Sequence, residues 1–187
     1  MRTLCMILVL TVLTAIVASA QKPGQKPAGE FAIAVKTTAP WHVAYQKSVG
    51  PYSGIPKAIS EVDAWATEQG LVVLGPVLSE YYNTPMEVDS TKLEWAIMLS
   101  VLEPAGGFPE ETKGTASVKS LDPMLVAYTY HQGPYDEVGA VYQRLFGWVF
   151  QNGYQPAGPI REIYWSNPEI TPEDKVISEL QIPVTKK

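Results

Sequence analysis

Apolar and polar residues alternate along two stretches of the chain that lie 83 residues apart. The stretches Trp41–Ser48 and Leu125–His131 combine this period of two with β-branched and aromatic residues, which is typical of half-buried strands. Each stretch is followed by the tripeptide Gly-Pro-Tyr, beginning at Gly50 and at Gly133. Glycine followed by proline interrupts a strand. The pattern therefore predicts, twice in one chain, a strand that ends in a tight turn.

A helical period follows each Gly-Pro-Tyr. In the second half, apolar residues recur at spacings of three and four and form one stripe: Val138, Val141, Tyr142, Leu145, Phe146 and Val149. Asp136 near the start suits the positive end of a helix dipole. Gly70 and Gly153 lie where a helix commonly ends in a left-handed residue. We therefore predict one helix in each half.

Two further strand patterns complete each half. They cover Val77–Tyr82, Glu94–Val101, Ile160–Trp165 and Val176–Val184. In the last strands, one face collects the apolar side chains that should contact the helices: Ile97, Leu99, Val101, Leu180, Ile182 and Val184. The unit is strand–helix–strand–strand. Two such units predict an α+β fold with antiparallel sheet and two main helices on one face.

The two halves also match residue by residue. Residues 35–85 align with 118–168 without a gap, and 15 of 51 positions are identical, where ordinary composition gives roughly 3 by chance. We infer a tandem duplication whose halves, about 31–102 and 115–184, pack around a pseudo-twofold axis. Residues 103–114 connect them, and 31–187 form a single domain.

The first 20 residues have the features of a secretory signal peptide. Leu4–Val17 is almost entirely apolar, and residues 18–20 are small, as a signal peptidase requires before Gln21. The alternative is an uncut membrane anchor, but the apolar run is shorter than the ~20 residues that span a bilayer. Cleavage predicts a secreted or periplasmic protein that lacks Cys5, the single cysteine, with residues 21–30 as a flexible leader.

Charge and composition exclude several classes of function. Acidic residues outnumber basic ones, 19 to 14, and no run of Lys or Arg occurs, so neither nucleic acid nor, after signal cleavage, a membrane surface is an expected partner. His42 and His131 stand in no metal-ligand spacing, and we expect no metal. Phosphate-binding loops and serine nucleophile elbows are absent from the sequence, and no cofactor is expected.

Glu179 and a group of aromatic residues are the candidates for a binding site. Glu179 lies between apolar neighbours on the strand face opposite the helix-facing residues, and its counterpart in the first half is Ala96. It is either a solvated strand residue or a carboxylate in a groove. The nearby aromatic residues are half-buried sheet residues or the walls of that groove: Tyr81, Tyr82, Trp95, Tyr128, Tyr130, Tyr135, Tyr164 and Trp165. A glutamate among aromatic rings suits an organic cation.

The second half resembles a known family. Residues 126–184 contain "GPY", "GW…NGY…GP", "REIY" with "NP" and a closing "SELQIPV", and resemble a GyrI-like small-molecule-binding domain of the kind found alone or in AraC-type and MerR-type regulators. With the first half included, the resemblance covers about residues 31–185. It implies a groove between the halves, a key glutamate that maps onto Glu179, and aromatic walls for which the nearest candidates are Tyr135, Tyr164, Trp148 and Trp95. Ala96 would leave room for the ligand beside Met98.

These observations leave three functions open. The first is an exported binding domain for small hydrophobic or cationic organic molecules, with Glu179 as the charged anchor. The second is a hydrolase on the same groove, since some stand-alone members of the family resemble enzymes that open strained cyclopropane rings, with Glu179 as the catalytic residue. The third is a haem carrier similar to SOUL proteins, for which neither histidine has a supporting context. No helix-turn-helix segment is present, so a transcription factor is not expected.

Overall fold

A computed structural model describes residues 31–108 and 116–187. The expected signal peptide (1–20) and leader (21–30) lie outside these residues, as does part of the expected connector. No helix in the described part of the chain is long and apolar enough to cross a membrane.

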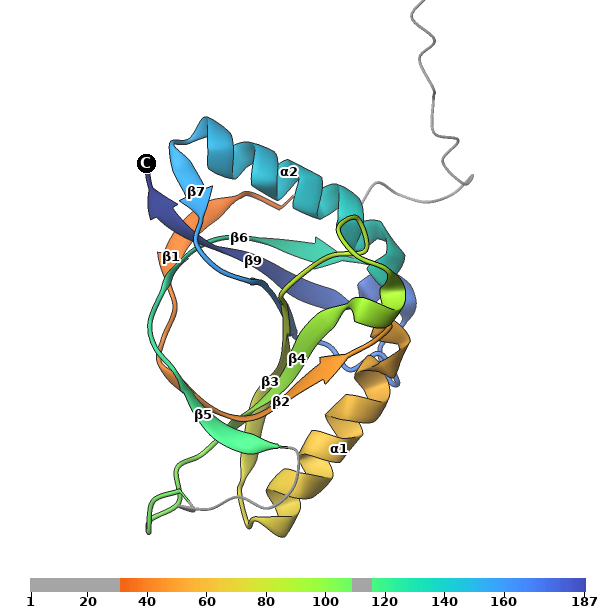
Figure 1. Cartoon of the computed structure of the whole chain (residues 1–187), viewed down its shortest axis with the longest axis vertical. Coiled ribbons are helices and arrows are strands. Elements are labelled where there is room, and N and C mark those ends of the chain that lie inside the picture. The colour runs from red at the N-terminus through yellow and green to blue at the C-terminus, as the bar shows by residue number, and fades with distance from the viewer. Residues whose placement is uncertain (1–30, 109–115) are drawn as a thin grey trace, which may run out of the picture.

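The described residues form nine strands and two α-helices (Figure 1). The first half holds β1 (Ala34–Thr37), β2 (Trp41–Val49), α1 (Ile55–Glu68), β3 (Val73–Tyr81) and β4 (Glu94–Val101). The second half holds β5 (Ser117–Leu121), β6 (Leu125–Gln132), α2 (Val138–Gln151), β7 (Tyr154–Pro156), β8 (Ile160–Tyr164) and β9 (Ile177–Lys186). Short 3₁₀ turns, η1 (Tyr52–Gly54) and η3 (Tyr135–Glu137), precede the helices, and η2 (Ser90–Lys92) and η4 (Glu173–Lys175) precede β4 and β9. The predicted α+β fold is confirmed, and β1, β5 and β7 are strands that the sequence pattern did not predict.

The strand order has the symmetry that the repeat suggests. All pairs are antiparallel, in the order β1-β6-β9-β8-β3-β4-β2-β5, and β7 pairs with the far end of β9. The 14-residue helices α1 and α2 begin at residues 55 and 138, again 83 apart. β3 pairs with its counterpart β8 at the centre of the sheet. At the edges the halves exchange strands, because β1 pairs with β6 and β5 pairs with β2.

The two edges of the sheet approach each other on the side away from the helices. The segments that lead from β1 to β2 and from β5 to β6 cross there, curving around the left of Figure 1. The amide of Thr38 donates to the carbonyl of Met124 (2.9 Å), and the amide of Met124 donates to Thr38 Oγ1 (3.0 Å). The sheet is therefore strongly curved, with one face toward the helices and the other toward this crossing.

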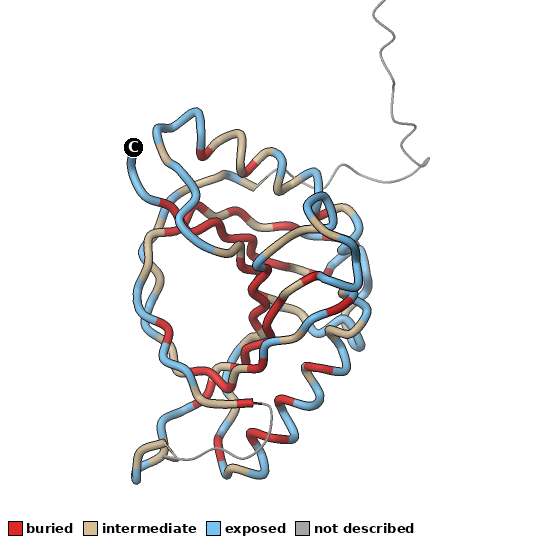
Figure 2. The backbone as a smooth tube through the Cα atoms, viewed as in Figure 1, coloured by how far each residue is buried: buried red, intermediate tan, exposed pale blue. Residues whose placement is uncertain are grey.

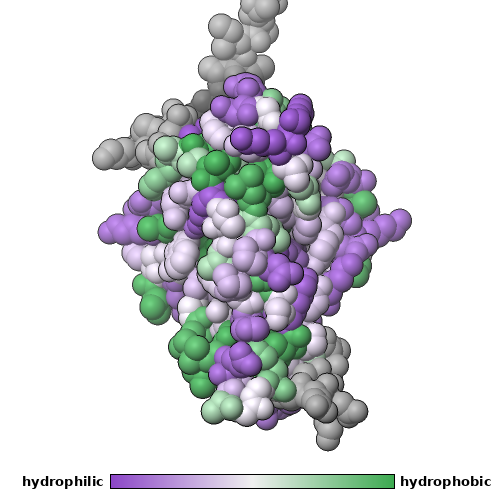
Figure 3. Space-filling model, turned by 90° about the vertical axis from the view of Figure 1, so that its left-hand side faces the viewer, coloured by the Kyte–Doolittle hydropathy of each residue, from purple (hydrophilic) through white to green (hydrophobic). Residues whose placement is uncertain are grey.

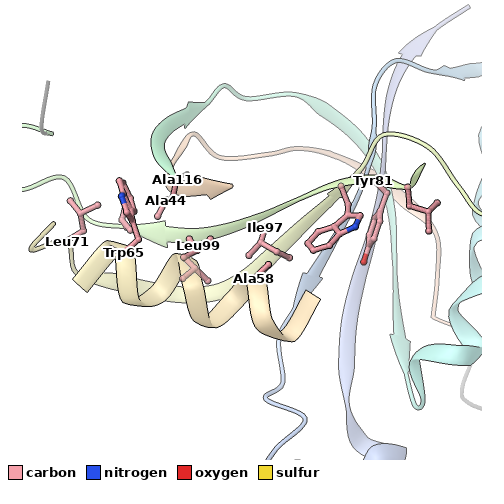
Figure 4. Close-up of a cluster of buried hydrophobic side chains, with 13 residues drawn as sticks. Ala44, Ala58, Trp65, Leu71, Tyr81, Ile97, Leu99 and Ala116 are labelled. Carbon is pink, nitrogen blue, oxygen red and sulfur yellow. The ribbon is translucent and has the colours of Figure 1, made fainter. Parts of the chain in front are cut away.

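Both helices pack on the same face of the sheet. Ile97, Ser79, Glu162 and Leu180 form one cross-strand row through the register of β4, β3, β8 and β9, so their side chains lie on one face. Ile97 packs with α1 in one buried cluster (Figure 4), and Leu180 packs with α2 in another. The buried residues concentrate along the central strands (Figure 2). The predicted helix-facing sides of β4 and β9 are confirmed.

In both halves, Gly-Pro-Tyr forms the turn that connects a strand to the following helix. Gly50 and Gly133 have φ of 132° and 135°, which side-chain-bearing residues rarely adopt. Their amides donate to the carbonyls of Leu93 (2.8 Å) and Val176 (2.9 Å). The proline then opens the 3₁₀ turn, and the tyrosine is that turn's first residue. Both tyrosines therefore lie at the N-terminal end of a helix, on the helix side of the sheet.

Candidate functional site

A cavity of about 1570 Å³ lies between the two helices, over the central strands β3 and β8. It exists because α1 packs mainly on β4 and β2, and α2 on β6, β7 and β9, which leaves the middle of the sheet uncovered. Its walls are the facing sides of α1 and α2, and loop residues 84–86 and 165–169 also line it. Ligand cavities in proteins commonly measure ~300–1,000 Å³, so this one is large enough for a bulky organic molecule.

The lining combines equivalent residues from both halves. Tyr52 and Tyr135 come from the two Gly-Pro-Tyr motifs, and Tyr81 and Tyr164 from β3 and β8. Their rings contact each other in edge-to-face pairs, Tyr52 with Tyr81 at a centroid distance of 5.0 Å and Tyr135 with Tyr164 at 5.7 Å. Tyr142 on α2 also lines the cavity. The doubled motif thus supplies an aromatic wall on each side.

Glu162 is a buried carboxyl group at the floor of this cavity. The hydroxyls of Tyr81 and Tyr164 donate to its Oε2 at 3.1 and 3.0 Å, and the two hydroxyl oxygens are 2.7 Å apart. Each hydroxyl has a single hydrogen, so only two of these three contacts can be hydrogen bonds donated by tyrosine at one time. Glu162 is therefore held in place by both halves of the molecule.

Burial dominates the protonation behaviour of this group. It raises the pKa of Glu162, although hydrogen bonds from Tyr164, Tyr81 and Tyr142 act in the opposite direction. Burial, followed by the neighbouring Tyr164 and Glu162, also holds the pKa of Tyr81 well above its ordinary value. The tyrosine hydroxyls consequently remain protonated donors, and the carboxyl gains its proton at a higher pH than an exposed glutamate does.

All the charged side chains among the described lining residues of the cavity are acidic. Besides Glu162, two exposed acidic residues, Asp63 and Glu169, line it, whereas no lysine, arginine or histidine occurs among its described lining residues. The position in the first half that corresponds to Glu162 holds Ser79, so only the second half supplies a carboxylate there. An apolar cavity with a single buried acid is suited to a large molecule that carries positive charge.

Of the six residues that the family resemblance singled out, two lie in this cavity and four do not; Tyr81 and Trp165, from the wider aromatic group, also line it. Tyr135 and Tyr164 line it, as described above. Trp148 belongs to α2 but stacks on Tyr154, with centroids 6.1 Å apart. Trp95 is buried in the core under α1, and its indole donates to the carbonyl of Gly50 (2.9 Å).

Glu179 and Met98 lie on the opposite face of the sheet. Met98 is fully buried there in an apolar cluster with Val43 and Leu78. Glu179 is also fully buried, so it is not a solvated strand residue, and it bonds Lys36 and Gln181 rather than lining the large cavity. The strand alternation placed it correctly opposite the helix-facing residues, but the large cavity opens on the helix face.

Sequence reasoning missed Glu162. The signal was available, because Ile160, Glu162 and Tyr164 alternate along β8 and therefore share a face. Since Tyr164 was already a candidate, its neighbour two residues earlier belonged to the same site. Among the residues described, no group of three or more potential ligands could hold a metal ion.

Comparison with known proteins agrees with this architecture. A family profile described as "GyrI-like small molecule binding domain" matches residues 31–185. The crystal structure of the EcmrR C-terminal domain has a TM-score of 0.74 and 21% identity, covering 84% of this chain and 99% of that one. The EcmrR chain in the cryo-EM structure of an EcmrR–DNA complex matches with a TM-score of 0.72 and 21% identity over 84% of this chain. The match covers 58% of that EcmrR chain, so this chain spans little more than half of its length.

A hydrolase from Listeria innocua has a TM-score of 0.63 at 14% identity, covering 82% of this chain and 91% of the other. No match is found among curated proteins. At these identities the solved structures establish a shared fold. The family profile, which spans both halves and the cavity between them, establishes that the chain belongs to the GyrI-like small-molecule-binding domain family.

Proposed function

We propose that this protein binds bulky hydrophobic organic cations in the cavity between α1 and α2, with the Glu162 carboxylate as the counter-charge. The observation that carries the proposal is the charge of the lining: one buried acid, two acids at exposed positions and no basic residue among the described lining residues. This assigns the role of anchor, which the family resemblance placed on Glu179, to Glu162.

The aromatic walls support the same ligand class. The faces of tyrosine rings attract a cation by ~0.5–1 kcal/mol at exposed sites and by ~2 kcal/mol where the site is desolvated. Tyr52 and Tyr135, one from each Gly-Pro-Tyr, line the cavity with Glu162, whose charge contributes, after burial, to raising the pKa of both. A delocalised cation loses less hydration than a compact ammonium when it enters such a site, so binding favours large, lipophilic cations over small ones.

The test uses two ions of nearly the same shape and opposite charge, tetraphenylphosphonium and tetraphenylborate, titrated calorimetrically. We expect wild-type protein to bind the cation and not the anion. Glu162→Gln should weaken cation binding by ~1–3 kcal/mol, the cost of losing a charged partner in a desolvated site. Glu179→Gln is the matched control on the other face of the sheet. Equal binding of both ions, or an unchanged cation affinity in Glu162→Gln, would contradict the proposal.

A second candidate function uses the same carboxyl group. Glu162 is buried, has a raised pKa and accepts hydrogen bonds from two tyrosine hydroxyls. Such a carboxylate can act as the general base that activates water, and the hydroxyls can act as proton donors. Hydrolysis of a strained electrophile, such as an activated cyclopropane, requires both roles. Incubation with such an electrophile, followed by mass spectrometry, should show addition of one water molecule. Turnover that persists in Glu162→Gln, or no turnover in the wild type, excludes this candidate.

We also propose that the protein acts outside the cytoplasm. The support is the apolar run and small residues at the start of the sequence. The intact mass of the protein from its native host should correspond to a chain that starts at Gln21. A full-length mass would contradict export by signal cleavage.

A further inference from the structure

The face of the sheet away from the helices holds a second, smaller cavity of about 220 Å³. Its walls come from β1, from the segment that crosses toward β2, and from β8 and β9. Figure 3 shows the molecule from this side, where weakly hydrophilic residues fill the middle of the face and hydrophobic patches lie above and below it. The small cavity and the large one lie on opposite faces of the sheet, so a ligand in one cannot contact the main floor residue of the other.

Glu179 is the buried acid of this small cavity. Its Oε1 accepts from the Lys36 ammonium and from Gln181 Nε2 (2.7 Å). Its Oε2 is buried and has no hydrogen-bond partner among the described residues. Tyr130 lies opposite Glu179 on β6, and the carboxylate contributes, after burial, to raising the pKa of Tyr130. A buried carboxylate oxygen without a donor is unfavourable, so a donor supplied from the cavity would stabilise it.

Arg161 brings a second positive charge to the same cavity. It is buried on β8, and its Nε and Nη2 donate to Glu80 Oε1 at 2.7 and 2.6 Å. The guanidinium carries five N–H donors, so this contact leaves donors for another acceptor. Lys36 and Arg161 together balance the charges of Glu179 and Glu80. The site is therefore neutral as a whole but has separate negative and positive points.

We propose that this cavity binds a compact zwitterion, such as a small α-amino acid, and that it is a second ligand site. The ammonium group would donate to Glu179 Oε2, and the carboxylate would face Lys36 and Arg161. A ligand with net charge would upset the balance between the three buried charged residues and the half-buried Lys36, whereas a zwitterion preserves it. Leu78, Leu121 and Ile163 supply apolar walls for a short side chain. The volume admits only a small molecule, in contrast to the cavity between the helices.

The test follows the indole N–H signals of the intact domain by NMR during titration with L-alanine. Trp41 lines the small cavity and not the large one, so its signal reports on this site alone. Trp65 and Trp148 line neither cavity and serve as internal controls. We expect a saturable shift of the Trp41 signal, with Trp65 and Trp148 unchanged. Methylammonium and acetate, which carry the two charges separately, should each bind at least tenfold more weakly than alanine.

Two variants make the assignment specific. Glu179→Gln should weaken alanine binding at least tenfold, whereas Glu162→Gln should leave it unchanged. Because Glu179→Gln also removes the ion pair of Lys36, Ala39→Phe provides a second variant: Ala39 is exposed and lines the cavity, so a larger side chain there should block entry without disturbing the core.

Three results would overturn the proposal. They are the absence of a saturable Trp41 shift with alanine, a shift that Ala39→Phe leaves unchanged, and binding of methylammonium or acetate as strong as that of alanine. Tetraphenylphosphonium binding does not enter this test, so the function proposed for the large cavity and the second site can fail separately.

Discussion

Glu162 and Ser79 occupy equivalent positions on β8 and β3, so only one half of the molecule places a carboxyl group on the sheet beneath the helices. Both side chains face the space between α1 and α2, in the row that crosses the centre of the sheet. Two carboxylates so close together in an apolar cavity would repel each other, and one would stay protonated. A single carboxylate at this position avoids the repulsion, and tyrosines from both halves surround it.

The pKa of Glu162 predicts how cation binding depends on pH. Because burial raises this pKa, the carboxyl gains its proton at a higher pH than an exposed glutamate, whose pKa is ~4.3. We expect the affinity for tetraphenylphosphonium to fall as the pH is lowered through the raised pKa. Glu162→Gln should lack this dependence, and calorimetry between about pH 4 and pH 8 measures both. An identical pH profile in the two proteins would show that another group is responsible.

The raised pKa of Glu162 also affects the folding stability of the ligand-free protein. This contribution to stability decreases as the pH rises, whereas the affinity for a cation increases. A carboxyl whose pKa is raised by folding contributes stability below its unfolded pKa and loses that contribution as the pH rises through the folded pKa. Glu162→Gln should therefore match or exceed the thermal stability of the wild type at neutral pH. A large loss of stability in the variant would indicate that the carboxylate is needed for the fold itself.

Local sequence patterns predicted most of the elements. The alternating stretches became β2, β3, β4, β6, β8 and β9 with bounds shifted by a few residues, and the apolar stripe became α2. Gly70 and Gly153 end the helices with φ of 69° and 76°, as expected. In contrast, β1 and β5 are four and five residues long and pair only with strands of the other half. Such non-local pairing leaves no signal in a short window of sequence.

The site was predicted in part for a similar reason. Alternation assigns each strand residue to one of two faces, and it separated Glu179 from Ile97 and Leu180 correctly. It does not tell which face will hold a cavity. That depends on how far apart α1 and α2 lie over the sheet, and this is a property of the packed helices. The family resemblance nominated Tyr135 and Tyr164, which line the cavity, and equally Trp148 and Trp95, which lie elsewhere.

The turn glycines allow a test at the level of one element. Gly133→Ala places a side chain at φ 135°, and strain of this kind costs ~1–3 kcal/mol. Gly147 lies inside α2 with no atom within 4 Å of an added Cβ, so Gly147→Ala should stabilise by ~0.5–1 kcal/mol. Urea denaturation of both variants measures the two effects. Equal effects of the two substitutions would show that the turn conformation is unimportant.

At the scale of the whole molecule, the exchanged edge strands make the two halves interdependent. A separate first half (31–108) would lose β6 as the partner of β1 and β5 as a neighbour of β2, and the central β3–β8 pair would be broken. Each half would also be small for an independent core. We expect neither 31–108 nor 116–187 to unfold cooperatively on its own, as followed by circular dichroism. A sharp thermal transition in either monomeric half would contradict this dependence.

The same interdependence explains why the large cavity needs both halves. One wall comes from α1 and the other from α2, and Glu162 from the second half accepts a hydrogen bond from Tyr81 of the first. The sheet then separates this cavity from the charged pocket around Glu179. The molecule therefore has two chemically different cavities on opposite faces of one sheet.

The most direct test of the account is the position of a bound cation. Tetraphenylarsonium has the shape and charge of the phosphonium probe, and its arsenic atom is located by anomalous X-ray scattering in a co-crystal. The account predicts one arsenic peak between α1 and α2, next to Glu162 and the rings of Tyr52 and Tyr135. An arsenic peak at any other place, with the cavity between the helices free of the ion, would contradict the central claim.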